Sequence, residues 1–184
     1  MLSPNFTPFP TLNTNRLVLR NINTKDAPEL FVMRNDERIM KYIDKPRAKS
    51  VDEAHAFIKM VLNLEKNNNA VTWAITLKES PKLIGTVCLW NFQKEHYLAE
   101  IGYALHPDYW NNGMMNEVII EVINYGFNVL KLHSIAANIN PGNEASAKLL
   151  EKNKFVREAY FKENFFYDGK FLDSAIYSLL APKL

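Results

Sequence analysis

The spacing of apolar residues along the chain predicts strands and helices that follow one another closely. Apolar runs, alternating in part, predict strands at 16–22, 71–77, 83–91, 98–105 and 133–139. Polar turns at Pro81 and at Gln93–His96 separate three of these runs, which are therefore expected to form an antiparallel meander. Two further runs, 155–166 and 171–180, predict a C-terminal hairpin with its turn at Tyr167–Lys170.

Capping residues mark where the helices between these strands should begin. Thr24 is expected to cap a first helix, and a short helical piece follows at 36–42. Ser50 and Glu53 have the spacing of a capping box at the start of the next helix, and Asn143 is expected to cap the last one. A further helix after Gly113 is expected to bury the apolar stripe Ile119, Ile123, Phe127 and Leu130.

The order of these elements predicts the fold class. The strand 98–105, the helix after it and the strand 133–139 form a succession typical of a parallel pair with a crossover helix. We therefore expect a single mixed α/β (α+β) domain with a mostly antiparallel sheet and one parallel pair. Residues 1–15, with prolines at 4, 8 and 10, are expected to be an irregular arm before a domain at 16–184.

Composition narrows the class of protein. The formal net charge of +2 and the absence of any Lys/Arg run favour neither nucleic acid nor a membrane surface as a partner. Cys88 is the only cysteine, which excludes an intramolecular disulfide, and its apolar neighbours predict an unreactive thiol. The four histidines show no ligand spacing, so no metal is expected. No signal pattern or long apolar stretch is present, so we expect a cytoplasmic protein.

The segment from His106 to Glu117 is the strongest candidate for ligand binding. It links a strand to a helix through a turn that contains Gly113. The first N–H groups of a helix lack internal partners and lie at its positive end, and glycine lets the backbone approach a ligand closely. The segment therefore predicts a phosphate site at 110–116, although an ordinary connection with Asn caps would show the same pattern.

Glu100 is the strongest candidate for acid–base chemistry. Alternation along the strand places it on one face with Gly102 and Ala104, while Ile101, Tyr103 and Leu105 share the other face. A carboxylate in an interior strand is costly to bury without a partner. Glu100 is therefore either paired with a neighbouring Arg or Lys, or it faces a cleft as a general base.

Asn143 and Ser146 have the spacing of a helix cap and the main-chain N–H that it accepts from. The Ser146 hydroxyl would then lie in the first helical turn, within reach of a ligand.

These segments together resemble a known family. They are the opening Asn13–Arg20 with Thr24–Ala27, the Glu100–Tyr103 stretch with Pro107–Gly113 and Glu117, and the Asn143–Ser146 stretch with Leu150–Phe155. In this order they resemble the GNAT acetyl-coenzyme A N-acetyltransferases, and within them the RimJ/RimL-like ribosomal-protein branch. The resemblance covers about residues 11–180. It implies a GNAT-like domain with a splayed parallel strand pair and helices on both faces of the sheet.

The resemblance also implies roles for individual residues. Acetyl-CoA would be the co-substrate, and Glu100 and Ser146 would be the catalytic residues. The cofactor-binding positions would be Tyr103, Ala104, Leu105, Trp110, Asn111, Asn112, Gly113, Met114, Met115, Asn143 and Ser146. Three residues depart from the family pattern: Asn111 replaces the first loop glycine, Met115 a small residue, and Lys154 the glycine before Phe155. Loop binding is expected to survive if Asn111 and Met115 avoid positive φ.

The acceptor stays open at this point. A protein N-terminal α-amino group is the first expectation, with a pKa of about 7.7–8.0 against about 10.4 for Lys. A small amine such as a polyamine, an amino sugar or an amino acid is the second. A non-catalytic acyl-CoA-binding protein is the alternative of a different class. No direct nucleic-acid or membrane partner is expected, and the oligomeric state stays open, a homodimer included.

Overall fold

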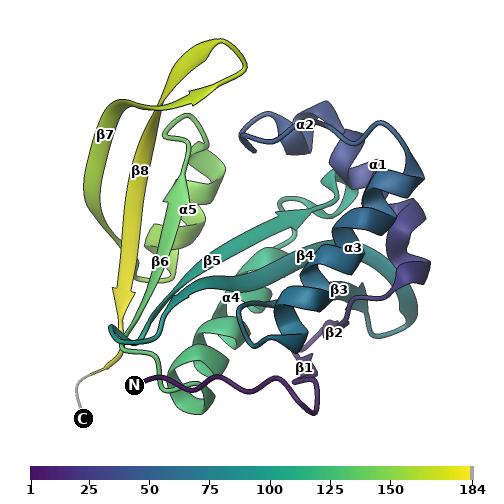
Figure 1. Cartoon of the computed structure of the whole chain (residues 1–184), viewed down its shortest axis with the longest axis horizontal. Helices are drawn as coiled ribbons and strands as arrows, with labels where there is room; N and C mark the ends of the chain where they lie inside the picture. Colours follow the sequence, from purple (N-terminus) through teal and green to yellow (C-terminus); the bar gives the residue numbers. More distant parts are fainter. Residues whose placement is uncertain (183–184) are drawn as a thin grey trace.

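The computed structural model describes residues 1–182, and within them an eight-stranded sheet is flanked by helices (Figure 1). The strands are β1 (Leu12–Asn13), β2 (Leu17–Asn21), β3 (Val71–Leu77), β4 (Ser80–Gln93), β5 (Leu98–Leu105), β6 (Ser134–Ile139), β7 (Val156–Tyr167) and β8 (Lys170–Leu180). The helices are α1 (Ala27–Asn35), α2 (Glu37–Met40), α3 (Val51–Lys66), α4 (Met114–Asn124) and α5 (Glu144–Lys152). Short turns of other helix types are η1 (Thr24–Asp26), η2 (Pro107–Tyr109) and η3 (Tyr125–Val129).

The strand order is β1-β2-β3-β4-β5-β6-β8-β7. Each neighbouring pair is antiparallel except β5 and β6, which run parallel with α4 crossing between them. The predicted meander, the parallel pair and the C-terminal hairpin are therefore confirmed. The fold class expected from the sequence is also correct.

Two apolar cores lie on opposite faces of the sheet, in agreement with the helices on both faces that the family resemblance implied. On one face, Val118, Ile119 and Val122 of α4 pack with strand residues such as Trp73 and Ile135, all fully buried. On the other face, α1 and α3 pack against β3 and β4 (Figure 1). Helices therefore cover both faces of the sheet.

The N-terminal arm is irregular apart from β1, yet it contributes to the first core. Leu2 and Phe6 are buried, and the Trp73 Nε1–H donates to the Pro10 carbonyl at 2.6 Å. The arm therefore covers apolar surface that the meander alone would leave exposed to water.

Three local expectations need correction. Asn23, not Thr24, caps the first turn, because its side chain accepts from the Lys25 N–H while Asp26 accepts from the Asn23 N–H. The expected box at Ser50 is half formed, since Glu53 accepts from the Lys49 N–H at 2.9 Å instead.

The third correction concerns the stripe on α4. Ile119 and Leu130 are buried as expected, but Ile123 and Phe127 are only partly buried, and Val118, Val122 and Tyr125 take the inner positions. The physical reason is that most of α4 between Val118 and Ile123 is apolar, so more than one helical face could be buried, and packing against the sheet selects the face of Val118 and Val122.

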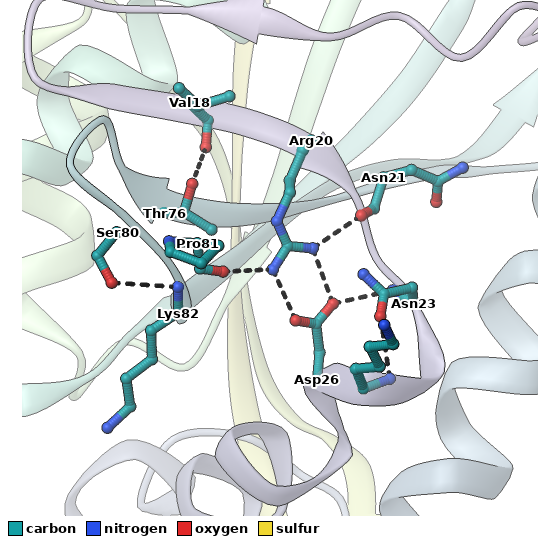
Figure 2. Close-up of polar contacts among 10 residues, drawn as sticks. Val18, Arg20, Asn21, Asn23, Asp26, Thr76, Ser80, Pro81 and Lys82 are labelled. Atoms are coloured by element: carbon teal, nitrogen blue, oxygen red, sulfur yellow. Dashed lines mark hydrogen bonds and ion pairs between the residues drawn. The ribbon is translucent and has the colours of Figure 1, made fainter.

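A buried ion pair ties the start of the chain to the meander (Figure 2). The Arg20 guanidinium donates to both Asp26 oxygens, at 2.6 and 2.9 Å, and also to the carbonyls of Asn21 and Pro81. Asp26 is only 5% exposed, and the hydrogen bond to it raises the pKa of Arg20. This cluster joins the β2–α1 connection to the start of β4.

No helix within residues 1–182 has the length and apolar character needed to cross a membrane.

Candidate functional site

The parallel strands β5 and β6 diverge soon after they meet. Their pairing runs from Leu98 opposite Ser134 to Glu100 opposite Ala136, and beyond that point the strands separate (Figure 1). The remainder of β5 stays paired with β4 on its other edge. The main chain from Ile101 to Leu105 therefore faces the divergence instead of a second strand.

A cavity of about 630 Å³ occupies this divergence. Its walls come from β5, the loop after it, the first turns of α4 and α5, and the segment at α2. The lining residues are Arg38, Ile39, Lys41, Tyr42, Ile43, Tyr103, Ala104, Leu105, Tyr109, Trp110, Asn111, Gly113, Met114, Met115, Asn116, Asn143, Ala145, Ser146, Leu149 and Lys152. Within the described part of the chain, this lining contains three cationic side chains and no carboxylate, so it suits an anionic ligand.

The loop between β5 and α4 forms one end of this cavity. Trp110 Nε1–H donates to the Leu105 carbonyl at 2.7 Å, which folds the loop back onto the strand. Gly113 has φ +71° and directly precedes α4, so only a residue tolerant of the left-handed region fits there. The N–H groups of the first turn of α4 lie beside the cavity without helical partners, as an anion requires.

Asn111 corrects one expectation, because its φ is +59° and not negative. Asn is enriched in the left-handed region among non-glycine residues, since its short polar side chain costs less there. Asn111 therefore adopts, at a modest cost, a left-handed conformation that glycine takes freely.

The start of α5 brings polar groups to the same cavity. The Asn143 Oδ1 accepts from the Ser146 N–H at 3.1 Å, so the predicted cap is confirmed. The hydroxyls of Ser146 and Tyr103 lie 2.7 Å apart, and burial raises the pKa of Tyr103 to about 12. Tyr103 therefore keeps its proton at neutral pH and can donate it in a hydrogen bond to Ser146.

Glu100 lies at the last paired position before β5 and β6 diverge. The Asn91 side-chain amide donates to its Oε1 at 2.6 Å, and Asn91 itself has φ +48° at an irregular point of β4. The Arg or Lys partner that the sequence left open is thus replaced by an amide. A neutral partner leaves the carboxylate negative without cancelling its charge, which suits a proton acceptor.

The structure brings most of the predicted site residues to one cavity, with two exceptions. Asn112 directs its carbonyl to the Arg16 side chain at 2.8 Å instead of lining the cavity. Glu100 lies on the strand face opposite Tyr103, so the predicted carboxylate and the Tyr103–Ser146 pair approach the divergence from different sides.

Several residues at this site were not indicated by the sequence alone. Arg38, Lys41 and Tyr42 line the cavity, and Asn91 holds Glu100. None has a local signature, because each is brought to the site by folding. The expected unreactive character of Cys88 has a physical basis, since burial raises the pKa of its thiol to about 12. Among residues 1–182 no group of three or more His, Cys, Asp or Glu side chains is placed to hold a metal ion.

Comparison with known proteins gives a consistent result. Residues 16–156 match the family model described as an acetyltransferase (GNAT) domain. The chain is 33% identical over 175 residues to the uncharacterized N-acetyltransferase YoaA of Bacillus subtilis, covering 95% of this chain and 99% of that protein. It is 26% identical to the ribosomal protein uS5-alanine N-acetyltransferase of Escherichia coli, covering 93% and 91%.

Solved structures agree in fold. An acetyltransferase of the GNAT family from Bacillus anthracis superimposes with a TM-score of 0.83 at 27% identity, covering 93% of this chain and 98% of that one. Spermidine N-acetyltransferase from Vibrio cholerae, in complex with CoA and spermine, superimposes with a TM-score of 0.78 at 25% identity, covering 89% and 95%.

Proposed function

Because this chain belongs to the GNAT acetyltransferase family and is thus an N-acetyltransferase, we propose that it acetylates protein N-terminal α-amino groups with Glu100 as the base. Acetyl-CoA is the proposed donor. The observation that carries the proposal is the divergence of β5 and β6 directly after Glu100, beside a cavity with cationic and main-chain donors. That arrangement lets a thioester reach the carboxylate through the sheet.

The residues of the cavity fit a coenzyme with a diphosphate. The N–H groups from Asn111 to Met115 are the proposed donors to the diphosphate, at the positive end of α4, whereas the Trp110 N–H already donates to the Pro107 carbonyl at 3.0 Å. The main chain of β5 at Tyr103–Leu105 is the proposed partner of the pantetheine arm, and the Asn143 side chain a further contact. When bound, the coenzyme supplies an activated acetyl thioester.

Glu100 is proposed to accept the proton that the amine must lose before it can attack. The bond from Asn91 fixes one carboxylate oxygen and so orients the other. A water between Glu100 and the amine would carry the proton if the two do not touch. The N–H groups near Leu105 are the proposed donors to the carbonyl oxygen as negative charge develops on it.

Ser146 and Tyr103 are proposed to serve the leaving thiolate. Ser146 is 7% exposed and bonded to the Tyr103 hydroxyl, whose proton is retained at neutral pH. Ser146 would donate a hydrogen bond to the sulfur while Tyr103 donates to Ser146. Holding donor and acceptor together in the cavity adds a proximity effect of up to about 7–11 kcal/mol in favourable systems.

The ease with which the amine loses its proton favours an N-terminus over a more basic amine. An α-amino group has a pKa of about 7.7–8.0 and is substantially neutral near pH 8, whereas Lys at about 10.4 is not. The similarity to the uS5-alanine N-acetyltransferase supports the same acceptor class.

A turnover screen tests this proposal. Release of free thiol from acetyl-CoA would be measured with a peptide that has a free N-terminus, its N-acetylated twin with a free Lys, spermidine, an amino sugar and a free amino acid. We expect kcat/KM for the free N-terminus to exceed each of the others at least about tenfold. A higher value for spermidine or a small amine would reassign the acceptor, and binding without turnover on any amine would overturn the catalytic role.

A further inference from the structure

Contacts from the N-terminal segment converge on the loop at the cavity. Glu117 lies in the first turn of α4, and its carboxylate accepts from the Thr14 hydroxyl at 2.8 Å, the Arg16 Nε at 2.6 Å and the Arg16 main-chain N at 3.3 Å. The second arm of the same guanidinium, Nη2, donates to the Asn112 carbonyl at 2.8 Å. Arg16 thus links the helix start to the loop that precedes it.

The contact to Asn112 determines how one peptide group is turned. In a trans peptide the C=O and the following N–H point in opposite directions. Because the Asn112 carbonyl points to Arg16, the N–H of Gly113 must point away from Arg16, and Gly113 lines the cavity. Gly113 tolerates either sign of φ, so the residue itself would not prevent this peptide from turning over.

The same contacts offset a charge beside the proposed diphosphate site. Partial burial alone would raise the pKa of Glu117, but the bonds from Thr14 and Arg16 lower it, so the carboxylate is ionised at neutral pH. A bare carboxylate in the first helical turn would repel a diphosphate at the same turn. The Arg16 guanidinium next to it compensates that charge.

Stability alone does not account for these contacts. The side chains of Arg16 and Glu117 are 41% and 22% exposed, and exposed ion pairs contribute little to folding. Arg16 instead bridges the Glu117 carboxylate in the first turn of α4 and the Asn112 carbonyl in the loop. A Lys ammonium could not make this two-armed contact.

We propose that Arg16 is a positioning residue for coenzyme binding: it holds the Asn112–Gly113 peptide with its N–H toward the diphosphate and compensates the charge of Glu117. This inference rests on the proposed binding of acetyl-CoA at the loop. It predicts that Arg16 affects only donors that carry the diphosphate. S-acetylpantetheine has the same thioester but no diphosphate, and so separates this role from a general one.

The test compares the two donors in steady-state kinetics, with the acceptor found most active in the screen. For Arg16→Gln we expect KM for acetyl-CoA to rise about tenfold, which corresponds to about 1.4 kcal/mol, with kcat within about twofold of the wild type. The kcat/KM for S-acetylpantetheine should stay within about twofold. Arg16→Lys should behave like Arg16→Gln, because one ammonium cannot serve both partners.

Arg47→Gln is the matched control, since Arg47 forms an exposed pair with Glu37 and neither side chain lines the cavity. It should leave both donors unchanged. Equal losses for both donors in Arg16→Gln, or no loss for either, would overturn the positioning role. If Arg16→Gln does not fold, Arg16→Lys decides by the same comparison. A wild-type protein that neither binds nor uses acetyl-CoA would instead overturn the proposed function itself.

Discussion

Two regions of the sheet, the β2–β3–β4 part and the β5–β6 divergence, use their polar residues differently. In the β2–β3–β4 part, Arg20 and Asp26 satisfy each other and two main-chain carbonyls, with Asp26 almost fully buried (Figure 2). At the β5–β6 divergence, Glu100 has an amide partner and the Tyr103–Ser146 pair lies at a cavity. Where strands stay paired, buried charges cancel and serve the fold, whereas where pairing stops, polar groups are left to act on a ligand.

The largest expected effect concerns the Arg20–Asp26 pair in the β2–β3–β4 region. Asp26→Asn leaves the Arg20 guanidinium without its charged partner and weakens the bond to the Asn23 N–H. We expect the free energy of unfolding to fall by about 3 kcal/mol, measured by urea denaturation. KM and kcat of the remaining folded protein should stay within about twofold of the wild type.

Glu37→Gln is the control for this change, because Glu37 pairs with Arg47 at the surface with 80% of its side chain exposed. It should change the free energy of unfolding by no more than about 0.5 kcal/mol. If Asp26→Asn left the free energy of unfolding unchanged but lowered kcat or raised KM, the proposed difference between the two regions of the sheet would be wrong.

The next effect concerns Glu100 at the β5–β6 divergence. Glu100→Gln keeps an oxygen that accepts from Asn91 but removes the proton acceptor. We expect kcat to fall about 10²-fold, equivalent to about 2.7 kcal/mol, while KM for acetyl-CoA and the free energy of unfolding stay near wild type. A rate like that of the wild type, on the acceptor identified by the screen, would remove Glu100 from the role of base.

A smaller effect concerns the two residues that replace family glycines. Lys154 has φ +69° just before β7, outside the cavity, and the left-handed region costs an L-residue about 1–2 kcal/mol. Lys154→Gly should therefore stabilise the protein by roughly 0.5–1 kcal/mol after the entropy cost of glycine. Asn111→Gly should gain less, because Asn tolerates φ +59° better than Lys. Urea denaturation of both variants measures the difference, and a destabilised Lys154→Gly would contradict this reading.

The smallest effect is a pH dependence of the Glu117 contacts. Because the pKa of Glu117 is lowered in the folded protein, its contribution is present above the ordinary Glu pKa of about 4.3 and is lost as the pH falls through the folded value. The stability difference between wild type and Glu117→Gln should be about 1 kcal/mol or less, constant above about pH 5, and smaller in more acidic solution. Urea denaturation at several pH values measures this difference in the free energy of unfolding. A difference that grows as the pH falls would contradict a lowered pKa of Glu117 in the folded protein.

Local patterns were sufficient for much of the fold and for the outline of the site. The strands at 71–77 and 98–105 match β3 and β5 to the residue, because apolar runs between polar turns encode them directly. The cap at Asn143 and the turn at Gly113 also follow from neighbouring residues alone. These features involve contacts between residues close in sequence.

The remainder depends on contacts between residues far apart in sequence. Arg16 and Glu117 are 101 positions apart, and nothing near either one predicts the pair. The burial of Phe6 among prolines, and the amide that Asn91 offers to Glu100, likewise arise only when the sheet assembles. The phase of α4 could not be predicted because its apolar residues at 118–120 and 122–123 fit more than one buried face, and only packing against the sheet selects one.

The central claim is that main-chain N–H groups of the loop at 110–116 bind the coenzyme's diphosphate. Hydrogen exchange of the main-chain amides, with and without saturating acetyl-CoA, tests it most directly. We expect strong protection of the amides from Asn111 to Met115 and at the start of α5, with little change in β2 and β3. Binding of acetyl-CoA that leaves the loop amides as exchangeable as before would contradict it.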